Sequence, residues 1–404
     1  MPRQGSKKQS SVTKSKTNTY QNQEDVYKMK RTPSSPQGGP KKRSAFIDLT
    51  NTTKTHTGIQ MKSGKTDSRA PDGKVICRTH AIRTDSKDFS SDEQPKKAEF
   101  KQEDSPLDGF SVCQPDEPSA IQEQKVPEEF DIDKEHAGDC FMSPEYAKEI
   151  FDYLKIREEK FILSDYMHNQ PDLNQDMRAI LIDWMVELQE NFELNHETLY
   201  LAVKITDHYL SVTVVMRELL QLIGSTAMLI AAKFEERCPP CVDDFLYICD
   251  DAYKRQELIA MEMNILRGLN FDINIPVPYR FLRRYAKVAH VNMKTLTLAR
   301  YVCESSLLEV ELVSERASRL ASACLLLALI TQGLGGWTPA LQYHSGYLLV
   351  DLSPLVRKLY AMLASPSNDK LKAVDNKYSH RVFFEVAKIP LVHTDTLEEA
   401  LMVI

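Results

Sequence analysis

The residues of this sequence best suited to support chemistry are its eight cysteines and ten histidines. Cys238 and Cys241, in "CPPC", have the spacing of a redox centre or of half a zinc site. The sequence contains no second CxxC and no paired histidines that would complete such a site. The other cysteines lack the spacing of a disulfide framework, so we expect free thiols. We therefore expect no bound metal and no other cofactor.

Motifs of enzyme active sites are also missing. The chain contains no Gly-rich phosphate loop, no HExxH, no GxSxG and no catalytic HRD segment. The histidines and cysteines are scattered without the spacing of a nucleophile and its base. We therefore expect no catalytic residue and predict a regulatory protein rather than an enzyme.

The first 140 residues are expected to be disordered. They contain 18 Leu, Ile, Val or Phe residues, about 13%, which is too few to bury a hydrophobic core. Residues 1–50 carry eleven Lys or Arg against three acids, whereas residues 85–139 carry seventeen acids against six bases. The sequence has no apolar run of membrane-spanning length and no signal-peptide core. We therefore expect a soluble intracellular protein.

Helical periodicity dominates from Pro144 onward, without the alternation that is typical of strands. Clusters of glycine, proline and asparagine separate the helical segments. This pattern predicts an all-α protein with helices packed in layers. The expected helices are 144–157, 177–192, 196–211, 217–235, 241–249, 253–268, 277–289, 293–309, 313–332, 340–349, 353–364 and 368–387.

A weak internal repeat indicates two tandem bundles. "GSTAMLIAA" at 224–232 aligns with "LASACLLLA" at 320–328, at an offset of 96 residues. Small residues let neighbouring helices approach closely, so each copy is expected to be the central helix of a bundle of about five helices. "INIPVP" at 273–278 is the expected joint. The predicted domains are a disordered tail (1–140), a first bundle with a preceding helix (141–274), a second bundle (275–390) and a C-terminal tail (391–404).

Charge distinguishes the ends of the two repeated segments. The first copy continues with "KFEE" at 233–236, where the second has "LITQ" at 329–332. Charge at the end of a buried helix is consistent with an interaction site that only the first bundle carries. Alternatively, Lys233 only complements the negative end of its helix dipole. The residues alone leave both interpretations open.

The segment "MRAILIDWMVEL" at 177–188 carries two apolar stripes at helical spacing, whereas a surface helix normally has one. Either the helix is central and buried on all sides, or one stripe packs on the core and the other binds a partner. The first stripe consists of Met177, Leu181, Trp184 and Leu188. The second stripe consists of Ile182, Met185, Val186 and Gln189.

These segments resemble those of a known family, the cyclins, and more specifically the mitotic B-type cyclins. The resemblance covers residues 143–390 and is carried by "MRAILIDWMVEL", "LQLIGSTAMLIAAKFEE", the prolines at 239–240 and "FLRRYAK" at 281–287. "PKKRSAFIDLTN", together with "FLRRYAK", is most similar to the third vertebrate B subtype. The resemblance implies two tandem five-helix folds that bind and activate a cyclin-dependent kinase in G2 and in mitosis or meiosis.

The resemblance also implies roles for individual residues. Arg178 and Asp207 match an ion pair that fixes helix register inside the first fold. Lys233 and Glu262 match two charges that meet the kinase at its mobile helix. Without the resemblance, Glu262 would be interpreted as an ordinary exposed helix residue. The apolar residues that would complete the kinase-binding surface are Ile150, Tyr153, Phe234, Leu266, Phe271 and Ile273.

The same resemblance suggests an interpretation of the two stripes at 177–188. One stripe is expected to pack into the first bundle, and the other to line a shallow hydrophobic groove that docks substrates or inhibitors containing Arg-x-Leu. An aromatic anchor beside Leu and Met suits such a peptide, and an acid suits its arginine. The groove residues are Met177, Ile180, Leu181, Trp184, Glu187, Leu220 and Gln221.

The polar N-terminal third contains "RSAFIDLTN" at 43–51, which resembles the destruction box that recruits mitotic cyclins to a ubiquitin ligase. Arg43, Phe46 and Asn51 occupy the motif positions, although Phe46 stands where leucine is usual. An aromatic side chain can fill the same apolar pocket. The basic "KKR" at 41–43 could serve nuclear import, so we expect a nuclear protein, but solvated charge explains the run nearly as well.

Two rival interpretations use the same pair of folds. An A-type cyclin would act by the same mechanism in another phase, whereas one class of transcription factor uses two cyclin-like folds to hold promoter DNA. The transcription factor should have a basic face on its second fold and an N-terminal zinc ribbon, and neither is apparent in the sequence. The net charge of −6 is also too small to indicate a nucleic-acid or membrane partner.

Overall fold

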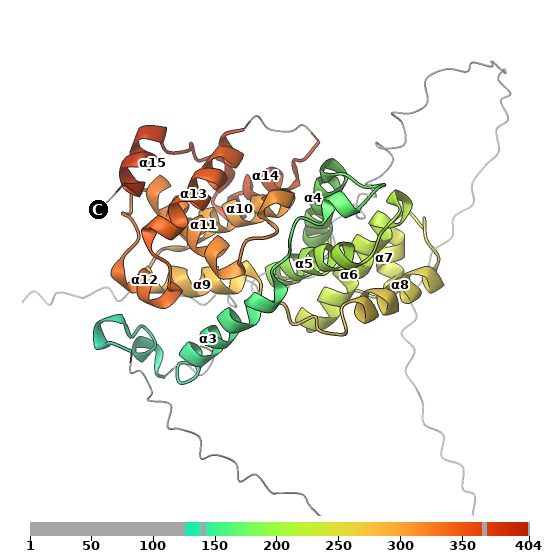
Figure 1. The fold of residues 1–404 in the computed structure, drawn as a ribbon, viewed down its shortest axis with the longest axis horizontal. Helices are drawn as coiled ribbons and strands as arrows, with labels where there is room; N and C mark the ends of the chain where they lie inside the picture. Colours follow the sequence, from blue (N-terminus) through green and yellow to red (C-terminus); the bar gives the residue numbers. More distant parts are fainter. Residues whose placement is uncertain (1–125, 139–142, 366–369, 403–404) are drawn as a thin grey trace, which may run out of the picture. The chain divides into compact units, whose positions relative to one another are not determined.

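The computed structural model describes residues 126–138, 143–365 and 370–402, and within these ranges every regular element is a helix (Figure 1). Two groups of five helices make up most of the described chain, as the sequence predicts. We call α4–α8 the first bundle, green to yellow in Figure 1, and α9–α13 the second bundle, orange to red.

The first bundle is built around one buried helix, α6. Its helices are α4 (Gln175–Asn191), α5 (His196–Val212), α6 (Leu220–Glu235), α7 (Val242–Ile248) and α8 (Arg255–Gly268). Helix α6 contacts each of the other four, and every residue from Leu220 to Ala232 is buried. At Gly224, a Cβ atom would lie only 2.7 Å from Leu181 Cδ1, so glycine is what lets α4 approach α6 this closely.

The second bundle repeats this plan around α11. Its helices are α9 (Pro278–Val288), α10 (Met293–Ser305), α11 (Ala317–Thr331), α12 (Pro339–Ser345) and α13 (Leu349–Ala364). Helix α11 contacts each of the other four, and its residues from Leu320 to Ile330 are all buried. The repeated segments are therefore the central helices of two tandem bundles, which confirms the predicted fold class.

The predicted helix at 368–387 is wrong. In the described part of that range only α14 (Ala373–Tyr378) is α-helical, and it is followed by the 3-10 turns η10 (Arg381–Phe383) and η11 (Val386–Lys388). The backbone is left-handed at Phe384 and Glu385, with φ of 55° and 52°. An L-residue cannot continue a right-handed helix in that conformation.

The predicted boundaries of both tails also differ from the structure. Residues 130–138, assigned to the disordered tail, include a buried Ile132 and Asp133, whose carboxylate accepts hydrogen bonds from Arg284 of α9 at 2.5 and 2.6 Å. The expected C-terminal tail contains α15 (Thr394–Leu401), which packs on α13 and buries Leu397 and Leu401. Both segments are short, and contacts with the second bundle hold them.

Candidate functional site

Lys233 and Glu262 form an ion pair at the surface of the first bundle. Lys233 lies in the last turn of α6 and Glu262 lies in α8, with Nζ and Oε1 2.6 Å apart. The Lys233 side chain is 46% exposed and that of Glu262 is 16% exposed. An ion pair this accessible contributes about 1 kcal/mol or less to folding. The position of Lys233 at the end of α6 also suits the helix dipole.

Exposed and half-buried apolar residues flank this ion pair. Phe234 directly follows Lys233 and is 46% exposed, and the half-buried Leu266 lies one turn beyond Glu262 on α8. After α8, Phe271 is 59% exposed although its φ is 59°, a left-handed conformation that is rare for an aromatic residue. Strained residues of this kind persist only where the surrounding structure holds them, and they cluster at functional sites.

The segment after α8 is tied to α3 (Ala147–Glu158), the helix that precedes the first bundle. Lys160 Nζ lies 2.5 Å from Asp272 Oδ2, and Arg157 pairs with the other carboxylate oxygen. The hydrogen bond from Lys160 lowers the pKa of Asp272. Arg157 also donates to the carbonyl oxygen of Asn274 at 2.7 Å. Asp272 lies between Phe271 and the half-buried Ile273, so these bonds fix the predicted contact residues relative to α3.

Helix α3 turns one apolar side outward. Ile150 and Tyr153, predicted to contact the kinase, are 43% and 52% exposed. Phe151 lies on the inner side, with its ring centroid 6.0 Å from that of Phe281. Tyr146 and Ile156, which the prediction did not include, are 59% and 75% exposed at helical spacing from the predicted pair. The pattern of exposed apolar residues could have been recognised only once the inner face of α3 was known.

Arg178 and Asp207, the expected internal ion pair, are brought together in the core. Arg178 Nε and Nη2 donate to the two carboxylate oxygens at 2.7 and 2.8 Å, and both side chains are 2% exposed. Tyr166 adds a hydrogen bond from its hydroxyl to Asp207 Oδ1 at 2.5 Å. Burial favours a higher pKa for Asp207, but the Arg178 charge outweighs it, so the pKa is lower than usual.

Arg178 also reaches the second bundle, which the sequence did not predict. Its Nη1 donates to the carbonyl oxygens of Leu307 and Leu308 at 2.9 and 3.3 Å. Both acceptors belong to η8 (Ser306–Leu308), the 3-10 turn that follows α10. The ion pair therefore joins the two bundles as well as setting the register of α4 against α5.

The two stripes of α4 are both packed against other elements. Leu181, on the first stripe, lies against Gly224 of α6. Gln189, on the second stripe, accepts a hydrogen bond from Lys377 of α14 at 2.8 Å. Asp183 likewise accepts from the backbone N–H of Ala373 at 2.8 Å. Because α4 lies between α6 and α14, burial on two sides explains both stripes.

The predicted docking groove is only partly accessible. Leu181, Trp184, Leu220 and Gln221 are buried, with at most 4% of any side chain exposed. Met177, Ile180 and Glu187 are half-buried and form the accessible part of the set. A peptide could therefore contact this region only along a shallow edge, and the groove stays a prediction.

A second buried ion pair, which the sequence analysis missed, lies where α14 meets α4 and α10. Lys377 of α14 pairs with Glu304 of α10, and these side chains are 1% and 0% exposed. Tyr378 donates to the other Glu304 oxygen at 2.7 Å. Burial lowers the pKa of Lys377 below its usual value even though Glu304 opposes the shift. The partners are more than 70 residues apart, so no local pattern predicts the pairing.

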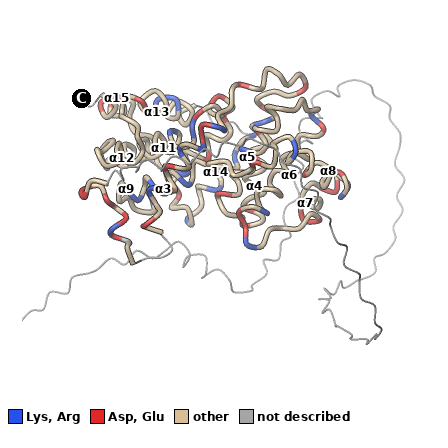
Figure 2. Tube along the Cα trace, turned by 60° about the horizontal axis from the view of Figure 1, so that its bottom comes forward, with Lys and Arg blue, Asp and Glu red and all other residues tan. Residues whose placement is uncertain are grey.

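The arginines of α9, in the segment "FLRRYAK" and just before it, face acidic partners. Arg280 pairs with Glu235 at 2.9 Å, and Arg283 approaches Glu197 at 3.5 Å. Arg284 is held by Asp133. Figure 2 shows basic and acidic positions interspersed along the described chain. The positive charge of α9 is thus neutralised locally, unlike a face that binds DNA.

Other predicted features take little part in this site. Arg43, Phe46, Asn51 and the basic run at 41–43 lie outside the described residues. Cys238 and Cys241 are exposed free thiols. Within the described ranges, no group of three His, Cys, Asp or Glu side chains could hold a metal ion. None of the helices in these ranges has both the length and the apolar character needed to cross a bilayer.

Comparison with known proteins identifies the class. The cyclin N-terminal domain matches residues 149–274, and the cyclin C-terminal domain matches residues 276–391. The first range contains nearly all of α3 and the whole first bundle, and the second contains the second bundle with α14. The chain belongs to the cyclin family.

Similar proteins are B3-type cyclins. The chain is 58% identical over 385 residues to the G2/mitotic-specific cyclin-B3 of Gallus gallus, covering 94% of this chain and 92% of that protein. Its identity to the Homo sapiens cyclin-B3 is 55% over 297 residues, covering 72% of this chain and 21% of that protein. Its identity to the Drosophila melanogaster cyclin-B3 is 50% over 279 residues, covering 67% of this chain and 48% of that protein. The chain thus resembles cell-cycle regulatory cyclins, although it spans half or less of the last two.

Proposed function

We propose that this chain is a regulatory subunit that binds and activates a cyclin-dependent kinase in G2 and in mitosis or meiosis. The observation that carries the proposal is the accessible pair Lys233 and Glu262, flanked by the exposed rings of Phe234 and Phe271. Apolar side chains in solvent around a charged centre are typical of a protein interface. Membership of the cyclin family supports a kinase as the partner.

In this mechanism the first bundle acts on the mobile helix of the kinase. Lys233 and Glu262 separate from one another and take partners on the kinase, while the apolar residues of α3, α6 and the segment after α8 bury themselves against it. The inward position of the mobile helix completes the Lys–Glu ion pair of the kinase active site and frees its activation loop. The cyclin supplies no group to ATP.

We also propose that the half-buried edge of α4 docks substrates or inhibitors carrying Arg-x-Leu. Met177 and Ile180 would supply apolar contacts and Glu187 the charge for the arginine. The segment at 43–51 would recruit a mitotic ubiquitin ligase through Arg43 and Phe46. The basic run at 41–43 would direct the protein to the nucleus. These assignments rest on the resemblance of the segments to cyclins.

The experiment that tests the proposed function is purification of the tagged chain from dividing cells, followed by identification of the bound kinase and assay of its activity. We expect a cyclin-dependent kinase in stoichiometric amount, with activity that peaks at G2 and mitosis. Recovery of the chain without any kinase, or on promoter DNA, would show that the assignment is wrong. A kinase peak in S phase would favour an A-type role instead.

A further inference from the structure

Charged residues at the C-terminal end of α3 bind the rest of the molecule, while Ile150 and Tyr153 on its outer side face solvent. Glu158, its last residue, is only 5% exposed. One carboxylate oxygen accepts a hydrogen bond from the backbone N–H of Ser318 at 2.8 Å, and the other accepts from the Ser318 hydroxyl. The Ser318 hydroxyl also lies 2.8 Å from the hydroxyl of Tyr347. The contact therefore anchors α3 in the second bundle.

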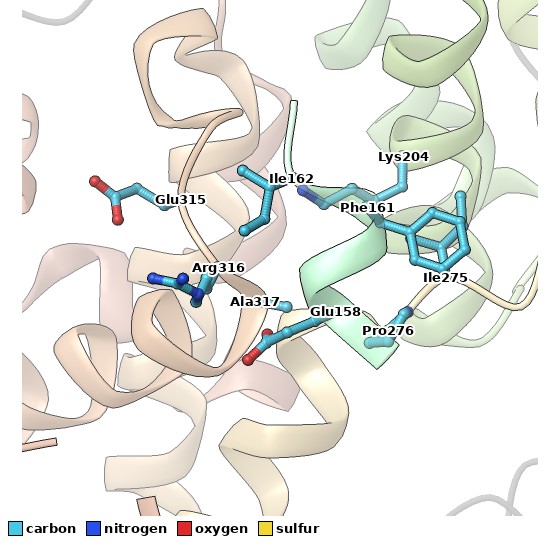
Figure 3. Close-up of a pocket in the computed structure, with 9 residues that line it drawn as sticks. All are labelled: Glu158, Phe161, Ile162, Lys204, Ile275, Pro276, Glu315, Arg316 and Ala317. Atoms are coloured by element: carbon cyan, nitrogen blue, oxygen red, sulfur yellow. The ribbon is translucent and has the colours of Figure 1, made fainter. Parts of the chain in front are cut away.

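Glu158 supplies a cap that α11 lacks. The N-cap residue of α11, Arg316, makes no side-chain capping hydrogen bond. The first N–H groups of a helix have no partner inside it, and the positive end of the helix dipole favours a carboxylate there. Figure 3 shows Glu158 pointing from α3 toward Arg316 and Ala317, where α11 begins. The central helix of the second bundle is thus capped from the helix that precedes the first.

Further charged residues at this end of α3 make matching contacts. Glu159 pairs with Arg316 at 2.5 and 2.9 Å. Lys155 donates to the carbonyl oxygen of Ser345, the last residue of α12, and its amine lies 5.4 Å from the centre of the Tyr347 ring. The second bundle therefore holds the end of α3 at two helix termini, the positive N-terminus of α11 and the negative C-terminus of α12.

A small pocket lies beside these contacts. Phe161, Lys204, Pro276 and Arg316 are among the residues that line it, together with Glu158 (Figure 3). The empty space lies between α5, the joint between the bundles and the start of α11. Glu158 and Glu159 hold this end of α3 to the start of α11, while Arg157 ties it to the segment after α8.

We propose that the second bundle contributes to kinase binding by holding α3 in place, with Glu158 as the positioning residue. The inference rests on the proposed function, since it takes Ile150 and Tyr153 as kinase contacts. Tyr153 lies five residues before Glu158, roughly 7.5 Å along the helix. Release of Glu158 from Ser318 lets α3 move and withdraws those side chains from the kinase. Glu158 itself needs no contact with the kinase.

The test is a double-mutant cycle measured as affinity for a purified, immobilised cyclin-dependent kinase. We expect Tyr153→Ala and Glu158→Ala each to weaken binding about tenfold, as removal of an interface anchor does. The double variant should also be only about tenfold weaker, because a released α3 no longer presents Tyr153. Glu158→Gln, which retains an oxygen acceptor for Ser318, should bind within about threefold of wild type.

Lys233→Ala is the matched control, because Lys233 lies on α6 and pairs with Glu262 of α8. It should weaken binding by the same factor with and without Glu158→Ala. Independent, multiplying effects of Glu158→Ala and Tyr153→Ala would contradict the proposal, as would an unchanged affinity of Glu158→Ala. If Glu158→Ala does not fold, Ser318→Ala takes its place in the same cycle. Failure of both Tyr153→Ala and Lys233→Ala to weaken binding would instead refute the proposed kinase function.

Discussion

The ends of α6 and α11 differ far more than the helices themselves. Both are central helices built from a repeated run of small and aliphatic residues, and both are buried along that run. Helix α6 then ends in the accessible Lys233 and Phe234, whereas α11 continues with Leu329 and Ile330, which are 4% and 6% exposed. The fold is thus the same in both bundles, whereas the proposed interaction site belongs to one of them. Under that proposal, function depends on a few residues at one helix end and not on the architecture.

The ion pairs themselves also differ in how far they are buried. Arg178 with Asp207, which joins α4 to α5, and Lys377 with Glu304, which joins α14 to α10, are buried. Lys233 with Glu262 is accessible and joins α6 to α8, two helices that already pack on each other. Loss of one partner of a buried pair leaves an uncompensated charge, while loss of an accessible pair costs little. Stability and binding should therefore respond to different ion pairs.

The largest expected effect on the folded body is that of Arg178→Leu. The change leaves Asp207 buried without its partner and removes the donor to Leu307, so we expect a loss of about 3–5 kcal/mol in the free energy of unfolding. Urea denaturation followed by circular dichroism measures the loss. The paired change of Arg178→Leu with Asp207→Leu should recover part of it. If Arg178→Leu lowers the free energy of unfolding by less than about 1 kcal/mol, the prediction is wrong, because only solvent-exposed ion pairs contribute so little.

The next effect concerns pH and His208. Burial lowers the pKa of His208 to about 4, while the unfolded chain titrates near 6.5. Between these values the unfolded state binds a proton that the folded state does not, so stability falls as pH falls, by up to about 3 kcal/mol at pH 4. His208→Gln removes this contribution. We expect its unfolding free energy to vary less than that of wild type between pH 6.5 and 4, and equal slopes would contradict the prediction.

A smaller effect is expected at the docking edge of α4. Met177→Ala with Ile180→Ala removes half-buried side chains, so the body should remain folded while phosphorylation of Arg-x-Leu substrates falls about tenfold in kcat/KM. A short peptide without the motif should be phosphorylated as before. Met293→Ala, at a 44% exposed position on α10, is the matched control in the second bundle. Equal loss on both substrates would mean that α4 only supports the core.

The smallest effect on the folded body is that of Arg43→Ala with Phe46→Ala. We expect kinase affinity and unfolding to be unchanged, while the protein persists through mitotic exit. A fusion of residues 1–70 to an inert, stable protein should become unstable at mitotic exit, because an extended motif needs no neighbouring fold. Immunoblots of synchronised cells measure both. A variant degraded on the wild-type schedule would exclude the destruction box.

The sequence was most informative where helical periodicity and small residues decide the structure. The alignment of residues 224–232 with 320–328 predicted two bundles and both central helices, because burial on every side requires small and aliphatic residues throughout. The same reasoning failed at 368–387, where α14 ends at Tyr378 and the backbone is then left-handed at Phe384 and Glu385. It also missed α15, whose stability depends on its contact with α13.

The structure brings some predicted residues of the candidate site together and shows contacts that the sequence did not predict. Lys233 and Glu262 were selected by a difference between the repeats and by a resemblance, and the structure places them 2.6 Å apart. The contact of Lys377 with Gln189 spans 188 residues, and that of Glu158 with Ser318 spans 160. Such partners follow from the packing of whole bundles, which periodicity does not specify. The burial of Trp184 was missed for the same reason.

The most direct test of the central claim is activation of a cyclin-dependent kinase by the double variant Lys233→Ala with Glu262→Ala. Arg357→Ala with Glu398→Ala removes a matched accessible pair, 2.7 Å apart, that joins α13 to α15. We predict that the first variant loses kinase activation and keeps its free energy of unfolding, measured by urea denaturation, to within about 1 kcal/mol, while the second activates like wild type. Full activation by the Lys233 and Glu262 variant, with the kinase bound as before, would contradict the account.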